Sequence, residues 1–315
     1  MAPSRVSPSP EDPTVPTKLS REQLSSYNSN GYLIIPNALS PSTVSLLLSE
    51  THTMLSSFSL ADHPLTKFST GENTPHVGDD YFLTSGDKIR FFFEEDAFSS
   101  SSGELIKPKH RAINKIGHYL HELSSPFKKA TFTRLHREIA KTIGMRDPRV
   151  LQSMIICKQP EIGGRVLPHQ DSTFLYTNPP SAVGFWIALE DATAENGCLS
   201  FARGSHRRTP LKSRMVRKEG AGTAFEDVEG AKFPEDMDVE KEKSDESEEQ
   251  YELAEVQAGT LVLIHGNLLH KSEKNLSGKS RFIYIFHCIE GENEYDRKNW
   301  LQPPKNGFSK LYQNV

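Results

Sequence analysis

Six short runs rich in β-branched and aromatic residues follow one another from about residue 150, and they constrain the fold more than any other feature. They read VLQSMIICK, FLYT, VGFWIALE, GCLSF, GTLVLIH and RFIYIFHCI. Each run has the length of a strand, and Gly, Pro, Asn or Asp residues stand between the runs. Many short strands with such separators are typical of a β-sandwich or barrel. We therefore expect a mainly β core.

The chain before residue 150 has helical signals as well. Ser20 and Gln23 have the spacing of a capping box, which predicts a short helix, and GYLIIP at 31–36 predicts a strand. Ser40 followed by Pro41 predicts the start of a longer helix with one apolar face. Helices are therefore expected to flank the β core.

Two further segments complete the expected organisation. Residues 87–98 predict a strand and hairpin, and residues 112–127 carry apolar residues at helical spacing around Lys115, which predicts another helix. Residues 1–18 are rich in Pro and Ser and have little to bury, so they predict a disordered tail. The remainder, 19–315, is expected to form one domain.

Acidic residues are concentrated in one stretch. Residues 219–255 contain fifteen Asp and Glu against three Lys, a net charge of −12. The whole chain carries −4, so the remainder carries +8. The stretch is too polar for a core, and it predicts a flexible acidic insertion at about 219–252, where a protein contact is also expected. The basic remainder suits a small anionic substrate. Nucleic acid is not expected, because no basic cluster with interleaved aromatic residues supports it.

Several classes of protein are disfavoured by what the sequence lacks. No apolar run reaches the roughly 18 residues of a membrane span, and the first residues have no apolar segment typical of a signal peptide. The final LYQNV does not match a C-terminal peroxisomal signal. Cys157, Cys198 and Cys288 are far apart and indicate neither a disulfide framework nor a thiolate zinc site. We expect a cytoplasmic protein.

The segment PHQDSTF at 168–174 is the strongest candidate for chemistry. His169 and Asp171 are two residues apart, so in an extended backbone their side chains project to the same side. Imidazole together with a carboxylate, with coordination positions left open, is the donor set of a redox iron site. A second histidine is needed to complete such a site.

Two histidines about 100 residues later are candidates for the third ligand, His265 and His270. Eleven residues after His270 comes Arg281, at the start of the strand RFIYIFH, whereas Leu276 stands at that distance from His265. The planar guanidinium of Arg binds a carboxylate through two parallel hydrogen bonds, which suits the distal carboxylate of 2-oxoglutarate. His270 is therefore the predicted ligand, and His265 is predicted to be structural.

Longer stretches resemble one known family. They are GDKIRFFFEEDAF, AINKIGHYLH, KQPEIGG with PHQD, FLYT, WIALEDATAENGCL, GSH, LVLIHGNLLHKSEKNLSGKSR and NWLQP. Their order and spread, from the helix near Ser20 almost to the end of the chain, are similar to those of the phytanoyl-CoA dioxygenase family. The resemblance implies a double-stranded β-helix, a cupin-like jelly roll packed by helices.

The resemblance also implies roles for individual residues. His169, Asp171 and His270 match the family's iron ligands. Contacts to the co-substrate are implied for six further residues: Lys115, Met154, Gln170, Trp186, Ser272 and Arg281. Residue type alone would place Met154 and Trp186 in the core. His206, in the turn RGSH, is expected to be structural, and contact with substrate is left open.

The implied activity uses Fe(2+), 2-oxoglutarate and O2, with ascorbate as a supporting reductant. It couples the oxidative decarboxylation of 2-oxoglutarate to hydroxylation of a small organic substrate, and the carboxylate of Asp171 favours hydroxylation over halogenation. The alternatives are an oxygenase that tailors secondary metabolites, a non-catalytic cupin-like metal- or ligand-binding module, and a hydroxylase of protein or nucleic acid.

Overall fold

The computed structural model describes residues 16–68, 78–220, 222–235, 237 and 249–312. The predicted tail at 1–18 therefore lies almost wholly outside the described residues. The α-helices are α1 (Arg21–Asn30), α2 (Pro41–Ser57), α3 (Asp80–Leu83), α4 (Leu120–Leu123), α5 (Ser125–Thr131), α6 (Arg134–Thr142) and α7 (Asp171–Phe174). The strands are β1 (Tyr32–Ile35), β2 (Ile89–Phe93), β3 (Ile113–His118), β4 (Pro148–Lys158), β5 (Val166–His169), β6 (Val183–Ala188), β7 (Leu199–Phe201), β8 (Ser213–Arg217), β9 (Thr223–Asp227), β10 (Glu252–Ala254), β11 (Leu261–His265), β12 (His270–Ser272), β13 (Arg281–Glu290) and β14 (Ser309–Lys310).

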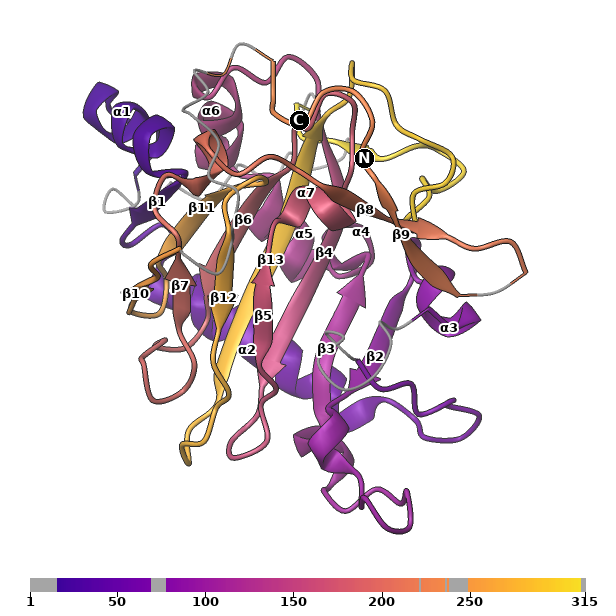
Figure 1. Ribbon diagram of the computed structural model, residues 1–315. Coiled ribbons are helices and arrows are strands. Elements are labelled where there is room, and N and C mark those ends of the chain that lie inside the picture. The colour runs from indigo at the N-terminus through magenta and orange to yellow at the C-terminus, as the bar shows by residue number, and fades with distance from the viewer. Residues whose placement is uncertain (1–15, 69–77, 221, 236, 238–248, 313–315) are drawn as a thin grey trace, which may run out of the picture.

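Two antiparallel sheets form the body of the molecule. The large sheet has the order β1-β11-β6-β13-β4-β3-β2, with β14 paired to β4, and the small sheet has the order β10-β7-β12-β5. Figure 1 shows the small sheet in front of the large one, with α2 and α5 behind the large sheet. This arrangement confirms the predicted mainly β jelly roll with flanking helices.

The central strands bury both of their faces. On β13, Phe282, Tyr284 and Phe286 belong to the core that the large sheet shares with α2, α5 and α6. Ile283 and Ile285 belong to a second core between the two sheets. Because successive side chains of a strand point to opposite faces, the odd-numbered residues of β13 face the space between the sheets.

The predicted starts of the first two helices are confirmed. The Ser20 hydroxyl accepts from the amide of Gln23 and the Gln23 side chain accepts from the amide of Ser20, which completes a capping box for α1. Ser40 caps α2 by accepting from the amide of Thr43, and Pro41 is its first residue. These local signals set where the two helices begin. In the folded chain, α1 lies beside β1 and α2 packs against the large sheet.

The helix predicted at 112–127 is wrong in its first half. Residues Ile113–His118 form β3, which pairs with β2 on one side and β4 on the other. Five of its six residues are buried. A strand covered on both faces loses the alternation of polar and apolar residues, so its sequence can imitate helical spacing. Only α4 and α5, from Leu120 onward, have the expected helical form.

The acidic stretch begins with regular structure. Residues Thr223–Asp227 form β9, which pairs along its whole length with β8, so this part of the predicted insertion is a strand. Near its other end, Glu249 is buried and accepts from Arg208 Nε at 3.0 Å and Nη2 at 2.7 Å. Residues 221, 236 and 238–248 lie outside the described residues. Flexibility of the stretch and a protein contact there stay predictions.

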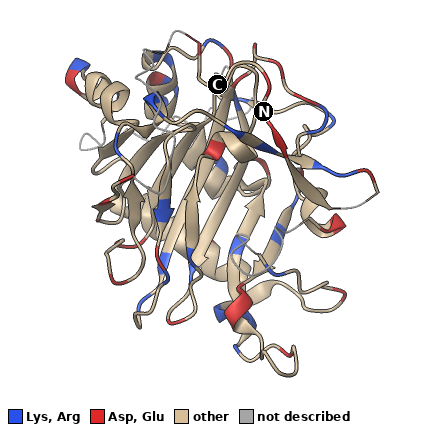
Figure 2. Ribbon diagram, viewed as in Figure 1, with Lys and Arg blue, Asp and Glu red and all other residues tan. Residues whose placement is uncertain are grey.

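Charge is distributed in keeping with this architecture. Figure 2 shows Lys, Arg, Asp and Glu mainly in loops and at strand ends, with the strands mostly free of charge. No helix in the described part of the chain combines the length and the apolar character needed to cross a membrane.

Candidate metal centre and co-substrate cavity

Three side chains, two from neighbouring strands of the small sheet and one from the helix α7, lie close together. His169 ends β5, Asp171 begins α7 and His270 begins β12, and His169 and His270 are direct partners in the β5–β12 ladder. One ligand atom from each lies within 4.8 Å of the others. The Nε2 atoms of His169 and His270 lie 3.6 and 3.8 Å from Oδ1 of Asp171. Two imidazoles and one carboxylate in this arrangement fit a 2-His-1-carboxylate iron site.

Backbone carbonyls orient both imidazoles toward this point. His169 Nδ1 donates to the carbonyl of Leu167 at 2.8 Å, and His270 Nδ1 donates to the carbonyl of Leu268 at 2.9 Å. In the neutral form of each ring the unprotonated nitrogen is therefore Nε2, which faces Asp171. Burial and, to a smaller extent, the neighbouring His169 lower the pKa of His270 to about 4, so His270 is neutral at pH 7. Neutral imidazole is the form that binds a metal ion.

The two other histidines considered for the site lie elsewhere. His265 accepts from the amide of Asn267 at 3.1 Å and packs on the ring of His206, with ring centroids 4.9 Å apart. Burial lowers the pKa of His265 to about 3. His206 bonds through Nε2 to the carbonyl of Asn28, and neither ring lines the cavity described below. Both therefore have a structural role.

A cavity of about 530 Å³ lies between the two sheets and contains the three candidate ligands. It is also lined by all six residues for which a co-substrate contact was predicted: Lys115, Met154, Gln170, Trp186, Ser272 and Arg281. They come from strands β3, β4, β6, β12 and β13 and from the residue before α7. The structure thus brings nine residues spread over 167 positions of the sequence into one cavity.

Arg281 is the clearest mark of an anion site in this cavity. Its side chain is buried, and its Nε atom has no hydrogen-bond partner among the described residues. The guanidinium carbon lies 5.6 Å from the ring centre of Trp186. Burial lowers the pKa of Arg281 to about 10, so the group still carries a charge at pH 7. A buried cation with an unused donor is costly unless an anion binds there, which fits the distal carboxylate of 2-oxoglutarate.

Lys115 supplies a second positive group. Its Nζ lies 3.4 Å from the ring centre of Phe68, and the side chain is buried. Burial lowers the pKa of Lys115 to about 7, and the negative charge of Asp171 opposes the shift. Gln170 is placed differently from its neighbours, because its amide donates to the backbone carbonyls of Thr209 and Asn267 at 3.0 and 2.7 Å. Those bonds secure the turn between the first two candidate ligands.

Sequence reasoning missed three polar residues of the cavity. His287 lies 3.2 Å from Oδ2 of Asp171. Lys158 donates to the carbonyls of Gly164, at 2.8 Å, and Glu273. Glu94 accepts from the amide of Gly164 at 3.1 Å, and burial raises its pKa to about 7. Strand alternation could have found two of them, because Lys158 shares a face of β4 with Met154, and His287 shares a face of β13 with Arg281.

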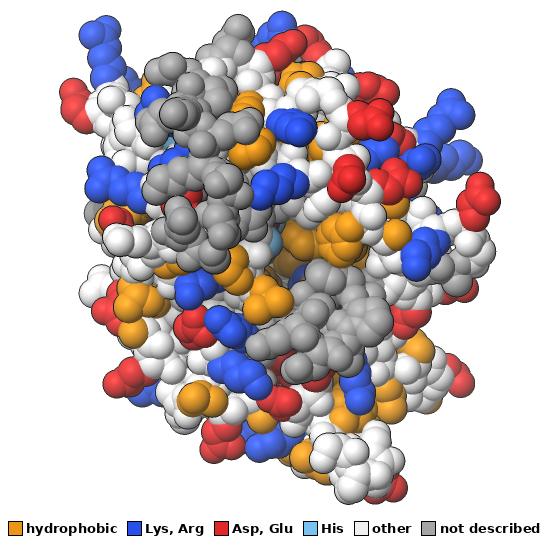
Figure 3. Space-filling model, viewed as in Figure 1, with side chains coloured by type: hydrophobic (Ala, Val, Ile, Leu, Met, Phe, Trp, Pro, Cys, Tyr) orange, Lys and Arg blue, Asp and Glu red, His pale blue; other side chains and the backbone are white. Residues whose placement is uncertain are grey.

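Aromatic side chains form one wall of the cavity. Phe82 and Trp300 stack with centroids 4.4 Å apart, and Phe174 contacts both the ring of His169 and that of Phe225. Phe225, on β9, is 46% exposed. On this face of the molecule, Figure 3 shows a hollow with hydrophobic side chains along one side and histidine at its base.

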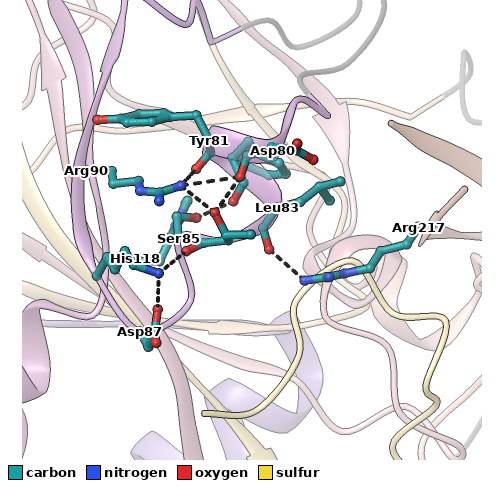
Figure 4. A network of polar contacts seen from close by, with 11 residues as sticks. Asp80, Tyr81, Leu83, Ser85, Asp87, Arg90, His118 and Arg217 are labelled. Atoms are coloured by element: carbon teal, nitrogen blue, oxygen red, sulfur yellow. Dashed lines mark hydrogen bonds and ion pairs between the residues drawn. The ribbon is translucent and has the colours of Figure 1, made fainter. Parts of the chain in front are cut away.

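A network of polar contacts holds this aromatic wall of the cavity together (Figure 4). Arg217 on β8 donates to the carbonyl of Leu83 in α3 and to that of Trp300, both at 2.6 Å. Arg90 on β2 donates to the carbonyl of Tyr81, and Ser85 bonds to Nδ1 of His118 at 2.7 Å. Strands β2, β3 and β8 are thereby fixed around the α3 turn.

Comparison with known proteins was made against this geometry. Residues 27–283 match the family model described as phytanoyl-CoA dioxygenase (PhyH). The chain belongs to the phytanoyl-CoA dioxygenase family. Phytanoyl-CoA dioxygenase domain-containing protein 1 of Danio rerio is 42% identical over 300 residues, covering 93% of this chain and 99% of the relative. A homologue of that protein in Caenorhabditis briggsae is 41% identical over 291 residues, covering 91% and 97%.

Solved structures share the fold of this family member at low sequence identity. The non-haem α-ketoglutarate-dependent carbocyclase SnoK has a TM-score of 0.60 at 19% identity, covering 89% of this chain and 87% of SnoK. EctD from S. alaskensis with bound Fe has a TM-score of 0.57 at 17% identity, covering 93% and 87%. Family membership and the ligand set together support the general class of non-haem iron dioxygenase.

Proposed function

We propose that the protein is an iron(II)- and 2-oxoglutarate-dependent dioxygenase that couples decarboxylation of 2-oxoglutarate to hydroxylation of a small organic substrate. The observation that carries the proposal is the grouping of three metal-binding side chains and a buried arginine in one cavity. Three donors of the right chemistry lie within 4.8 Å of one another, and a buried arginine with an unused donor lines the same cavity. A metal and a dicarboxylate are the ligands that this pair of features would recognise.

The chain's own residues would divide the work as follows. His169, Asp171 and His270 would hold iron(II) and leave its remaining positions open. Arg281 would bind the distal carboxylate of 2-oxoglutarate, with Lys115, Ser272 and Trp186 completing its pocket. When bound, the metal and co-substrate supply the activation of O2.

The aromatic wall of the cavity would exclude water from the reacting groups. Phe174 packs against His169 and Phe225, so the substrate group that approaches the metal passes aromatic side chains rather than water. Exclusion of water favours attack on the substrate's C–H bond over loss of the oxidant to side reactions. Ascorbate would keep the metal reduced.

The rival functions are supported less well. The carbocyclase SnoK, from nogalamycin biosynthesis, shares the fold at only 19% identity. Relatives of the domain-containing protein 1 type are about 40% identical to this chain over almost their whole length. A non-catalytic cupin-like module would need a defect in the ligand set or in the carboxylate anchor, and both are complete. A cytoplasmic location remains a prediction.

Succinate formation tests the proposal without a known primary substrate. Wild-type protein incubated with Fe(2+), 2-oxoglutarate and ascorbate should release succinate slowly, and a chelator should stop it. Asp171→Ala should release none above background. Equal rates with and without Fe(2+), or an Asp171→Ala protein as fast as the wild type, would overturn the proposal.

A further inference from the structure

The two oxygens of Asp171 face different partners. Oδ1 faces the Nε2 atoms of His169 and His270, at 3.6 and 3.8 Å. Oδ2 points the other way and lies 3.2 Å from Nε2 of His287 on β13. His287 therefore contacts one carboxylate oxygen, Oδ2, while the other oxygen, Oδ1, faces the two candidate histidine ligands.

A further contact lies on the other side of the His287 ring. The side-chain amide nitrogen of Gln152 lies 3.4 Å from Nδ1 of His287, and both side chains are buried. A carboxylate only accepts hydrogen bonds, so in the contact with Asp171 Oδ2 the ring proton lies on Nε2 of His287. His287 is then a donor to Asp171. Gln152 and His287 are also cross-strand partners in the β4–β13 ladder, so the backbone holds the two in register.

The space for this contact depends on Gly184. Gly184 on β6 is the cross-strand partner of His287. A Cβ atom at position 184 would lie 3.2 Å from Asp171 Oδ2 and 3.5 Å from Cδ2 and Nε2 of His287. A side chain there would press on the hydrogen bond itself. The contact between Asp171 and His287 is thus closely packed and leaves no room for a side chain at position 184.

We propose that His287 is a positioning residue that keeps Asp171 bound to iron(II) through Oδ1 alone. The inference rests on the proposed function, since it concerns the ligand set of that metal. A carboxylate free to turn can bind through both oxygens and occupy an additional coordination position. The proposed chemistry needs those positions for the co-substrate and O2. Holding Oδ2 by a hydrogen bond preserves them and orients Oδ1 before the metal arrives.

Co2+ binding to the metal-free protein tests this role without relying on turnover. His287→Leu removes the donor, and we expect Co2+ affinity to fall by about 10- to 100-fold, the range for a lost partner of a metal ligand. His287→Gln keeps an N–H donor and should recover part of the affinity. His136→Leu is the matched control, because His136 is also buried but packs on the helix-facing side of the large sheet. It should bind Co2+ like the wild type.

Gly184→Ala tests the same contact if His287→Leu fails to fold. It should weaken Co2+ binding in the same direction by a smaller factor. The visible ligand-field bands of Co2+, whose intensity depends on coordination number, should change in both variants and stay unchanged in His136→Leu. Wild-type affinity and spectra in His287→Leu and Gly184→Ala would overturn the role of His287. A wild-type protein that binds no Co2+ would overturn the proposed function itself, and the two failures are distinguishable.

Discussion

The two faces of β13 differ sharply in the residues that they carry. Phe282, Tyr284 and Phe286 pack into an apolar core against the helices. One residue out of step with them, Arg281 and His287 face the cavity and carry polar groups into a buried space. The same backbone thus supports stability on one side and ligand binding on the other. Substitutions on the two faces should have separable effects.

Phe286→Ala should have the largest effect on stability. Phe286 is fully buried and stacks on Phe185, with ring centroids 4.6 Å apart. Loss of a buried Phe side chain costs about 3–5 kcal/mol through lost burial and the cavity left behind. Urea unfolding should show this loss, while the folded fraction should bind 2-oxoglutarate like the wild type. A large loss of 2-oxoglutarate affinity would break the division between the two faces.

Arg281→Met should weaken the binding of 2-oxoglutarate without lowering stability, the reverse of Phe286→Ala. Loss of one partner of a buried charge pair costs about 2–5 kcal/mol of binding, so 2-oxoglutarate affinity should fall by a factor of about 30 or more. The ligand-free protein should be no less stable, because an uncompensated buried charge has been removed. Arg281→Lys, which keeps the charge without the planar guanidinium, should have a 2-oxoglutarate affinity between those of the wild type and Arg281→Met. Undiminished affinity in Arg281→Met would contradict this assignment of the anion site.

The pKa of Lys115 predicts a pH dependence of moderate size. Because burial lowers this pKa to about 7, the lysine is charged below pH 7 and loses its charge as the pH rises through 7. The affinity for 2-oxoglutarate should therefore fall, by up to about tenfold, between pH 6 and 8. Titrations at several pH values should show this slope in the wild type and a flat profile in Lys115→Met. An equal slope in the variant would assign it to another group.

The stability of the ligand-free protein should change with pH in the opposite direction. The unfolded chain holds the Lys115 proton up to its ordinary pKa of about 10.4, whereas the folded chain releases it near 7. Between these values the unfolded state binds more protons, so the contribution of Lys115 to the free energy of unfolding rises with pH. The difference between wild type and Lys115→Met should show this rise.

Phe225→Ser should have the smallest effect on stability. Phe225 is the same residue type as Phe286, but it is 46% exposed at the outer end of the cavity. Surface substitutions away from caps and buried networks usually change stability by less than about 0.5 kcal/mol. Leu253→Ser, at an even more exposed apolar position on β10, is the matched comparison. A cost like that of Phe286→Ala would show that β9 is part of the main core.

The sequence predicted the features that depend on local pattern or on a family motif. The series of short strands predicted a mainly β core, the resemblance to the family implied the jelly roll, and the caps at Ser20 and Ser40 predicted the first two helices. The histidine–aspartate pair and the distance from His270 to Arg281 placed the candidate ligands. These signals survive in a single sequence because they are set by neighbouring residues or by short distances along the chain.

The remaining features depend on contacts between distant strands. β3 was mistaken for a helix because side chains on both of its faces are buried, which hides its period of two. His287 carries no motif, and its role follows only from the fold, which places it opposite Asp171. Lys158 likewise becomes informative once β4 is seen to pair with β13, which sets it beside Arg281. Pairing across a sheet is not encoded in local spacing.

The choice of His270 over His265 is the most direct test of the proposed metal centre. The two histidines are five residues apart, His265 at the end of β11 and His270 at the start of β12, but of the two only His270 is directed at Asp171. Iron-dependent succinate formation should be measured in His270→Ala and His265→Ala side by side. We predict background rates for His270→Ala and retained turnover in the folded fraction of His265→Ala. Wild-type turnover in His270→Ala would contradict the proposed site.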